Sequence, residues 1–166
     1  MIVTVKIKGE NKMENLEQKP VIKKKMEKET AIKLLNEIRE NIGGVDLETI
    51  CDENNEITPE NINDEITKRL VQAIQCGLVY WDENENVLIQ KLIRPLKSGD
   101  MLANELKYQY KLTIHDLKMI NTPGVGELEV FENALAQITG RGRALIGRLS
   151  GQDIQIASGC LSFFAQ

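Results

Sequence analysis

The sequence predicts an α+β fold that is mainly helical. Apolar residues recur at helical spacing in several segments of the 166-residue chain, and two short β-type runs flank a polar pentapeptide. Hydrophobic residues make up 42% of the chain and charged residues 28%, a composition typical of a globular protein with a sizeable core. We therefore expect an N-terminal helical pair, a β-hairpin and a C-terminal helical block.

Residues 1–26 differ from the rest of the chain. Residues 2–8 alternate between apolar and polar side chains, which predicts a half-buried strand, and the Lys-rich residues 9–25 predict a flexible arm. The charge balance is +3 over residues 1–30 and −8 over residues 31–66. The cluster Lys23, Lys24 and Lys25 could contact nucleic acid, but a solvated arm facing the acidic segment is the favoured interpretation.

Residues 27–77 predict an acidic helical pair. The first helix spans residues 27–42 and ends before the Gly43-Gly44 pair. The second begins at Thr58-Pro59, with Thr58 as the N-cap, and ends at Gly77. The residues expected to face the core are Ala31, Leu34, Leu35, Ile38 and Ile42 in the first helix, and Ile62, Ile66, Leu70 and Ile74 in the second.

Residues 78–166 are expected to form a third unit, which begins with the hairpin. Its strands are predicted at 78–81 and 87–93, around a polar loop at 82–86. Pro95 is expected to end the second strand, and the turn at 97–100 to launch a helix near Met101–Tyr108. Another short helix is predicted at 113–120, with Thr113 as its cap.

A break at residues 123–126 precedes the C-terminal helical block. Its first helix ends at Gly140, a short helix follows near residues 145–149, and Ser150 opens the last helix with Asp153 at the capping-box position. The residues expected to face the core are Leu128, Phe131, Leu135 and Ile138 in the first helix, Leu145, Ile146 and Leu149 in the short one, and Ile154, Ala157, Leu161 and Phe164 in the last.

Few residues of this chain suit catalysis or metal binding. His115 is its single histidine, and Cys51, Cys76 and Cys160 are too scattered for a zinc site. The segment GRGRALIGRL has P-loop glycine spacing, but Arg148 and Leu149 stand where lysine and a hydroxyl residue are needed. We expect no catalytic residue, no cofactor and no metal.

The acidic loop of the hairpin could also be interpreted as a metal site. The carboxylates of Asp82, Glu83 and Glu85 could bind calcium, but the EF-hand spacing and central glycine are absent.

No apolar run reaches the roughly 18 residues of a membrane span, and the first residues do not form a signal peptide. The sequence therefore favours an intracellular protein with reduced thiols, which works by binding a partner through apolar grooves and helix faces.

Residues 78–164 resemble the Mu-like phage tail assembly chaperone family. The resemblance rests on an ordered set of features: the hairpin LVYWDENENVLIQKLIRP, the turn at 97–100, a helix ending in Ile138-Thr139-Gly140, and Arg148-Leu149-Ser150 leading a terminal helix that ends in Phe163-Phe164. In the family, comparable features stand in the same order. About half of the chain is covered, and residues 1–77 lie outside the resemblance.

The resemblance implies a non-catalytic chaperone of virion assembly, made in the cytoplasm of the host bacterium from a phage or prophage. Such a protein binds the tape measure protein, helps recruit tail tube subunits and is absent from the mature virion. The residues expected to contact partners are Phe163, Phe164, Arg141, Arg143 and Arg148. Two alternatives stay open: a structural phage tail or tail-completion protein, and a small nucleic-acid-binding regulatory protein.

Overall fold

The computed structural model describes residues 22–42, 62, 64–98, 101–109, 124 and 126–164. Five helices and a three-stranded antiparallel sheet are formed by these residues, so the predicted α+β, mainly helical class is confirmed. The predicted strand at 2–8, the Gly43-Gly44 stop and the helix at 113–120 lie outside the described residues, as do Cys51 and His115. The elements are α1 (Lys28–Ile42), α2 (Glu65–Gln75), β1 (Val79–Asp82), β2 (Val87–Ser98), β3 (Met101–Tyr108), α4 (Glu127–Thr139), α5 (Arg143–Ile146) and α6 (Gly151–Ser162).

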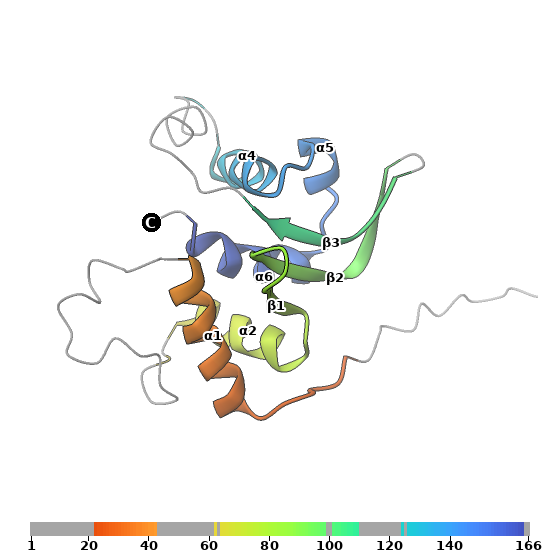
Figure 1. The fold of residues 1–166 in the computed structure, drawn as a ribbon. Coiled ribbons are helices and arrows are strands. Elements are labelled where there is room, and N and C mark those ends of the chain that lie inside the picture. Colours follow the sequence, from red (N-terminus) through yellow and green to blue (C-terminus); the bar gives the residue numbers. More distant parts are fainter. Residues whose placement is uncertain are drawn as a thin grey trace, which may run out of the picture.

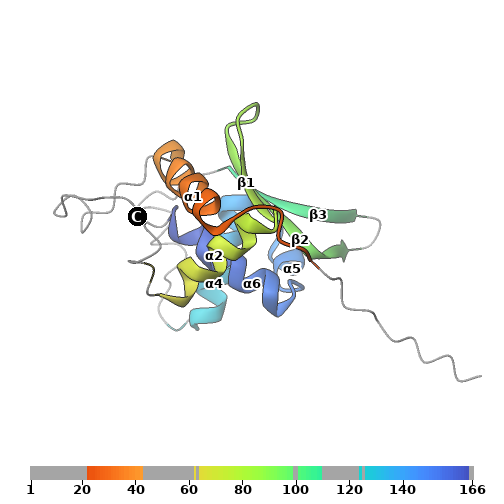
Figure 2. The same ribbon diagram turned by 90° about the horizontal axis from the view of Figure 1, so that it is seen from below.

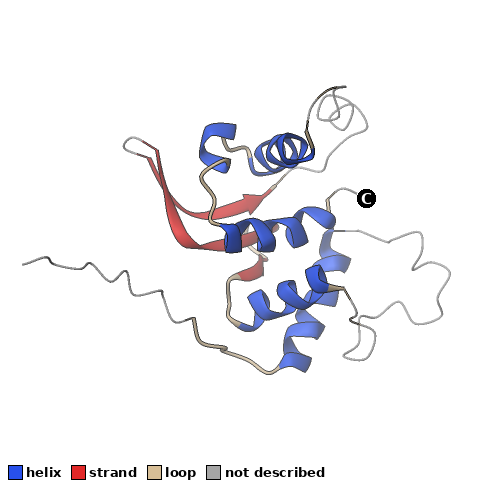
Figure 3. Ribbon diagram, turned by 180° about the vertical axis from the view of Figure 1, so that it is seen from behind, coloured by secondary structure: helices blue, strands red, loops and turns tan. Residues whose placement is uncertain are grey.

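The helices lie on two sides of the sheet, whose strand order is β1-β2-β3 (Figure 1). Helices α4 and α5 are on one side, and the α1–α2 pair is on the other. Helix α6 runs between these groups and contacts β2, α2 and α4, as the view from behind shows (Figure 3). A single hydrophobic cluster extends through all of these elements, with α1 and α2 contributing to it as well as the segment after residue 78. The predicted division into three units stays a prediction.

Helix α1 confirms the first predicted helix, and four of its five predicted core residues are buried. Ile32 is buried as well, and Leu34 is partly buried against the core. Before α1, residues 22–27 pass alongside α2 (Figure 2), and the Lys25 amide donates to the carbonyl oxygen of Gln75 at 2.7 Å. This hydrogen bond ties the chain that enters α1 to the end of α2.

Helix α2 starts later than the sequence predicts. Its N-cap is Asp64, not Thr58, and the Asp64 side chain accepts a hydrogen bond from the Thr67 amide at 2.6 Å. Both residues suit an N-cap, so the sequence alone did not separate them. Ile66 was expected in the core but is 49% exposed. The helix ends as predicted: Gly77 has φ +68°, and the Gly77 and Leu78 amides donate to the Ile74 and Ala73 carbonyls in a Schellman motif.

The hairpin forms where it was predicted, with Val79 paired to Gln90 and Asp82 to Val87. Its loop contains Asn86 at φ +55°, a conformation that asparagine tolerates better than most residues. Strand β2, however, does not end at Pro95. It continues to Ser98, and its pairing with β3 shifts between Lys91 and Leu96 in a β-bulge. Pro95 is tolerated because its missing N–H falls where the ladder is already interrupted.

The helix expected near Met101–Tyr108 is wrong, because these residues form strand β3. Met, Leu, Ala, Glu and Lys are good helix formers, which accounts for the error. The extended β2 offers a partner on both sides of the bulge: Leu96 pairs with Ala103, and Gln90 pairs with Leu106. Backbone pairing and burial of Ala103, Leu106 and Tyr108 override the local preference.

The C-terminal helices form as predicted, with two corrections to their buried faces. Helix α4 packs through its C-terminal half, with Leu135 and Ile138 buried, whereas Leu128 is 65% exposed. Gly140 ends it at φ +62°. In the last helix, Ile154 and Leu161 are only partly buried. The buried residues of α6 are Asp153, Ile156, Ala157, Gly159 and Cys160, and Phe164, just after the helix, is buried as well.

Candidate functional site

A groove of about 620 Å³ lies between α2, the first half of α6 and the bulge of β2. Its apolar surface comes from Ile22, Ala73, Leu78, Ile93 and Ile156. Its polar rim comes from Glu65, Lys68, Arg69, Gln72, Gln152 and Gln155. An apolar floor with a polar rim is the usual composition of a site that accepts a helix or an extended segment of another protein.

The α2 wall of the groove is set by the amphipathic character of that helix. Leu70, Val71 and Ile74 are buried in the core, so the polar Lys68 and Gln72 stand on the outer face. Asp64 fixes the start of the helix. Burial raises the pKa of Asp64, but the hydrogen bonds from Thr67 together with those from the backbone of Asp64 and Ile66 outweigh burial, and the pKa is lowered. The carboxylate therefore caps the helix as an anion.

The α6 and β2 walls are joined by Asp153, whose side chain is fully buried. Ser150 and Asp153 form the predicted cap: the Asp153 amide donates to Ser150 Oγ at 3.2 Å, and Ser150 Oγ donates back to Asp153 Oδ2 at 2.6 Å. The same carboxylate accepts hydrogen bonds from the backbone N–H groups of Ile93 at 2.8 Å and Arg94 at 3.4 Å. Asp153 thus holds Ile93 beside α6 and fixes the shape of the groove.

A series of buried hydrogen bonds leads from Asp153 into the core. Gln90 Nε2 donates to the carbonyl oxygen of Asp153 at 3.0 Å, and the Tyr108 hydroxyl donates to Gln90 Oε1 at 2.6 Å. Burial raises the pKa of Cys160 to about 12, against a smaller lowering by the hydrogen bond with Tyr108. Burial also raises the pKa of Tyr108 well above its ordinary value. The Cys160 thiol therefore stays protonated at neutral pH, and a protonated thiol is a poor nucleophile.

The two predicted partner-contacting phenylalanines lie at the end of α6. Phe164 is buried, and its ring stacks on Tyr108 with the centroids 5.8 Å apart. Phe163 is partly buried and packs against the core. In this structure Phe164 contacts the core of its own chain, as its phase in the last helix suggested.

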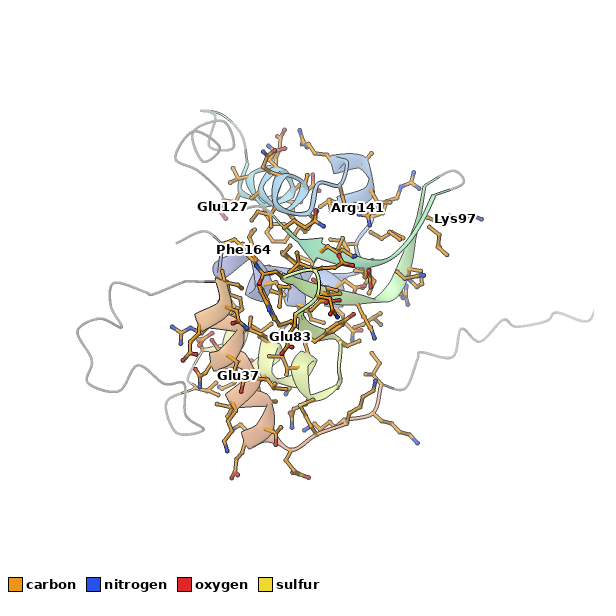
Figure 4. The ribbon with its side chains drawn as sticks, in the orientation of Figure 1. Glu37, Glu83, Lys97, Glu127, Arg141 and Phe164 are labelled. Atoms are coloured by element: carbon orange, nitrogen blue, oxygen red, sulfur yellow. The ribbon has the colours of Figure 1, made fainter. Side chains whose placement is uncertain are left out.

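The three predicted arginines lie on the α4–α5 side of the molecule. Arg143 Nη2 is 3.0 Å from Glu129 Oε1, and Arg148 Nη1 donates to the carbonyl oxygen of Lys97 at 2.7 Å. Arg141 is partly buried. Figure 4 labels Arg141 after α4 and Phe164 after α6. Because Phe164 is buried against Tyr108 while Arg143 and Arg148 are exposed, the predicted residues do not form one exposed surface.

The groove between α2 and α6 was not predicted from the sequence. The helical stripes indicated which faces of α2 and α6 are apolar, but no local pattern says which two helices lie side by side. Polar groove residues such as Gln72 and Gln155 look like ordinary solvated positions. Only Asp153, found through its capping-box position, carried a sequence signal for this site.

The acidic hairpin tip that could have held calcium makes its own hydrogen bonds. Asp82 Oδ1 accepts from the amides of Asn84 at 2.9 Å and Glu85 at 3.2 Å. Glu85 forms an ion pair with Lys107 on β3. Across the described part of the chain, no group of three or more His, Cys, Asp or Glu residues is placed to hold a metal ion.

No helix among the described residues is long and apolar enough to cross a membrane. Comparison of the chain with protein-family models, with curated proteins and with solved structures found no match in any of the three.

Proposed function

We propose that the protein is a non-catalytic phage tail assembly chaperone, which binds the tape measure protein and helps recruit tail tube subunits in the cytoplasm of the host bacterium. The observation that carries the proposal is the order of features in residues 78–164. The hairpin, the helix that ends at Gly140 and the terminal helix that ends in Phe163-Phe164 occur in the order found in that family.

The groove between α2 and α6 supports this proposal on physical grounds. A chaperone of a long helical protein must cover apolar helix faces and release them when the tail tube polymerises. The groove has an apolar floor for such a face, and its polar rim keeps the free protein solvated. Because its lining contains polar and charged residues as well as apolar ones, it suits reversible binding better than a permanent interface.

The buried hydrogen bonds of Asp153, Gln90 and Tyr108 support a structural role for these polar residues and not a catalytic one. Every buried side-chain nitrogen or oxygen among the described residues has a hydrogen-bond partner. Asp153, Gln90 and Tyr108 bond to one another and to the backbone, and not into the groove. Their arrangement stabilises the walls of a binding surface.

Co-expression with a tape measure protein, the partner that the proposal names, tests the proposal. We expect the chaperone to raise the soluble fraction of the tape measure protein and to co-purify with it. Gln155→Trp fills the groove with a large ring and should abolish co-purification, whereas Gln137→Trp, at an exposed position on α4, should not. Unchanged solubility together with no complex for the unaltered chain would refute the proposal.

Two further measurements separate the alternative functions. Mass spectrometry of purified particles should lack this chain if it is an assembly factor, and should contain it if it is a structural tail component. The exposed Lys23, Lys24 and Lys25 would instead carry a nucleic-acid function. A salt-dependent DNA or RNA shift that is lost when these three lysines are neutralised would favour that alternative.

A further inference from the structure

A second hollow, of about 160 Å³, lies between α1 and the β1–β2 hairpin. It shares no lining residue with the groove between α2 and α6. Apolar side chains form much of its wall: Met26, Leu34, Ile38, Ile74 and Val79. Its volume is about a quarter of that of the groove, which suits one side chain rather than a whole helix face.

Asn41 and Gly77 also line the pocket, and the rest of the lining is aromatic and acidic. Tyr80 and Trp81 come from β1, Glu83 from the hairpin loop and Glu37 from α1. Figure 4 shows Glu37 and Glu83 on neighbouring elements of the same face of the molecule. Both glutamates are exposed, and neither forms an ion pair or a hydrogen bond with another described residue.

More carboxylates than ammonium groups act on Tyr80 in the hairpin. Burial raises the pKa of Tyr80, the carboxylates of Glu105, Asp82 and Glu85 raise it further, and Lys107 lowers it. The Lys91 ammonium lies 5.1 Å from the centroid of the Tyr80 ring, so this ring already attracts a cation. Lys91 does not line the pocket, and no basic residue is among its described lining residues. The Lys25 side chain lies beside the lining residue Gly77, but it forms no ion pair with Glu37 or Glu83.

We propose that this pocket binds an arginine side chain of a partner protein. The aliphatic stem would pack on the apolar wall, and the guanidinium would lie at the mouth between Trp81 and the carboxylates of Glu37 and Glu83. Arginine fits best because its planar, weakly hydrated head stacks on aromatic rings and forks to carboxylates, while its stem covers apolar surface. The proposal does not depend on tail assembly.

Trp81 gives a direct assay, because it is the only tryptophan in the chain. The probe is a blocked tripeptide with arginine between two glycines, titrated in low-salt buffer while Trp81 fluorescence is recorded. The matched probe has citrulline in place of arginine, which keeps the shape and removes the charge. We expect saturable binding of the arginine peptide, at least about tenfold weaker binding of the citrulline peptide, and weakening with added salt.

Two variants locate the recognition. Glu37→Gln and Glu83→Gln keep the side-chain shape and should each weaken arginine-peptide binding about fivefold. Glu40→Gln, on the same helix but outside the pocket lining, should bind like the unaltered chain. Equal binding of the two peptides, no saturable change in Trp81 fluorescence, or unaltered binding in both glutamate variants would overturn the proposal. None of these results bears on the tape measure co-purification.

Discussion

Asp153→Asn should destabilise the protein far more than its small chemical change suggests. The carboxylate accepts hydrogen bonds from the Ile93 amide, the Arg94 amide and the Ser150 hydroxyl in a site with 0% exposure. Asparagine keeps one acceptor oxygen, but its NH₂ group must face either the β2 amides or Ser150. At least one hydrogen bond to a charged group is therefore lost, and a buried donor faces another donor. We expect a loss of about 2 kcal/mol in the free energy of unfolding.

Urea denaturation at neutral pH measures this loss, and Asp82→Asn is the matched control. Asp82 also accepts hydrogen bonds from two backbone amides, but it does so at the exposed hairpin tip, where water replaces a lost partner. Asparagine suits such a turn, so we expect a change below about 0.5 kcal/mol. Amide exchange gives a local test, because Asp153→Asn should speed exchange at Ile93 and Arg94. A stability within about 0.5 kcal/mol of the unaltered chain would show that Asp153 does not hold the bulge.

Four other substitutions test other parts of the fold. Tyr108→Phe leaves Gln90 Oε1 without its donor and should cost about 1–2 kcal/mol in the free energy of unfolding, measured by urea denaturation. Gly140→Ala should cost about 1 kcal/mol, because φ is +62° there, whereas Gly151→Ala, in the open first turn of α6, should raise the thermal midpoint. Cys160 has a raised pKa, so the stability that its protonated thiol contributes is fully present below pH 9 and is lost as pH rises towards 12. Between pH 9 and 10, the urea midpoint of Cys160→Ala should therefore fall less steeply than that of the unaltered chain.

Helix ends were the features that local sequence predicted best. Gly77 and Gly140 end their helices in the left-handed conformation that glycine favours, and Ser150 caps α6 as expected. Each of these features depends on contacts within a few residues along the chain. Helix α2 shows the limit of such reasoning, because its N-cap is Asp64, and local sequence does not decide which of several suitable cap residues begins a helix.

Features that depend on distant residues were missed. The segment Met101–Tyr108 has helix-forming side chains, and only its pairing with β2 makes it a strand. The groove requires α2 and α6 to lie side by side, and the small pocket requires α1 to meet the hairpin. Such contacts join residues far apart in the sequence, and neither hydrophobic periodicity nor capping motifs encode them.

Asp153 shows how one buried residue connects the local and the distant features. As a capping-box residue it could be placed from sequence at the third position of α6, but its carboxylate is used on the β2 bulge instead of on the Ser150 amide. Because it satisfies two amides where the ladder is broken, β2 can run past Pro95 and pair again with β3. The same bonds place Ile93 in the groove. The proposed partner surface therefore depends on a side chain that no partner would touch.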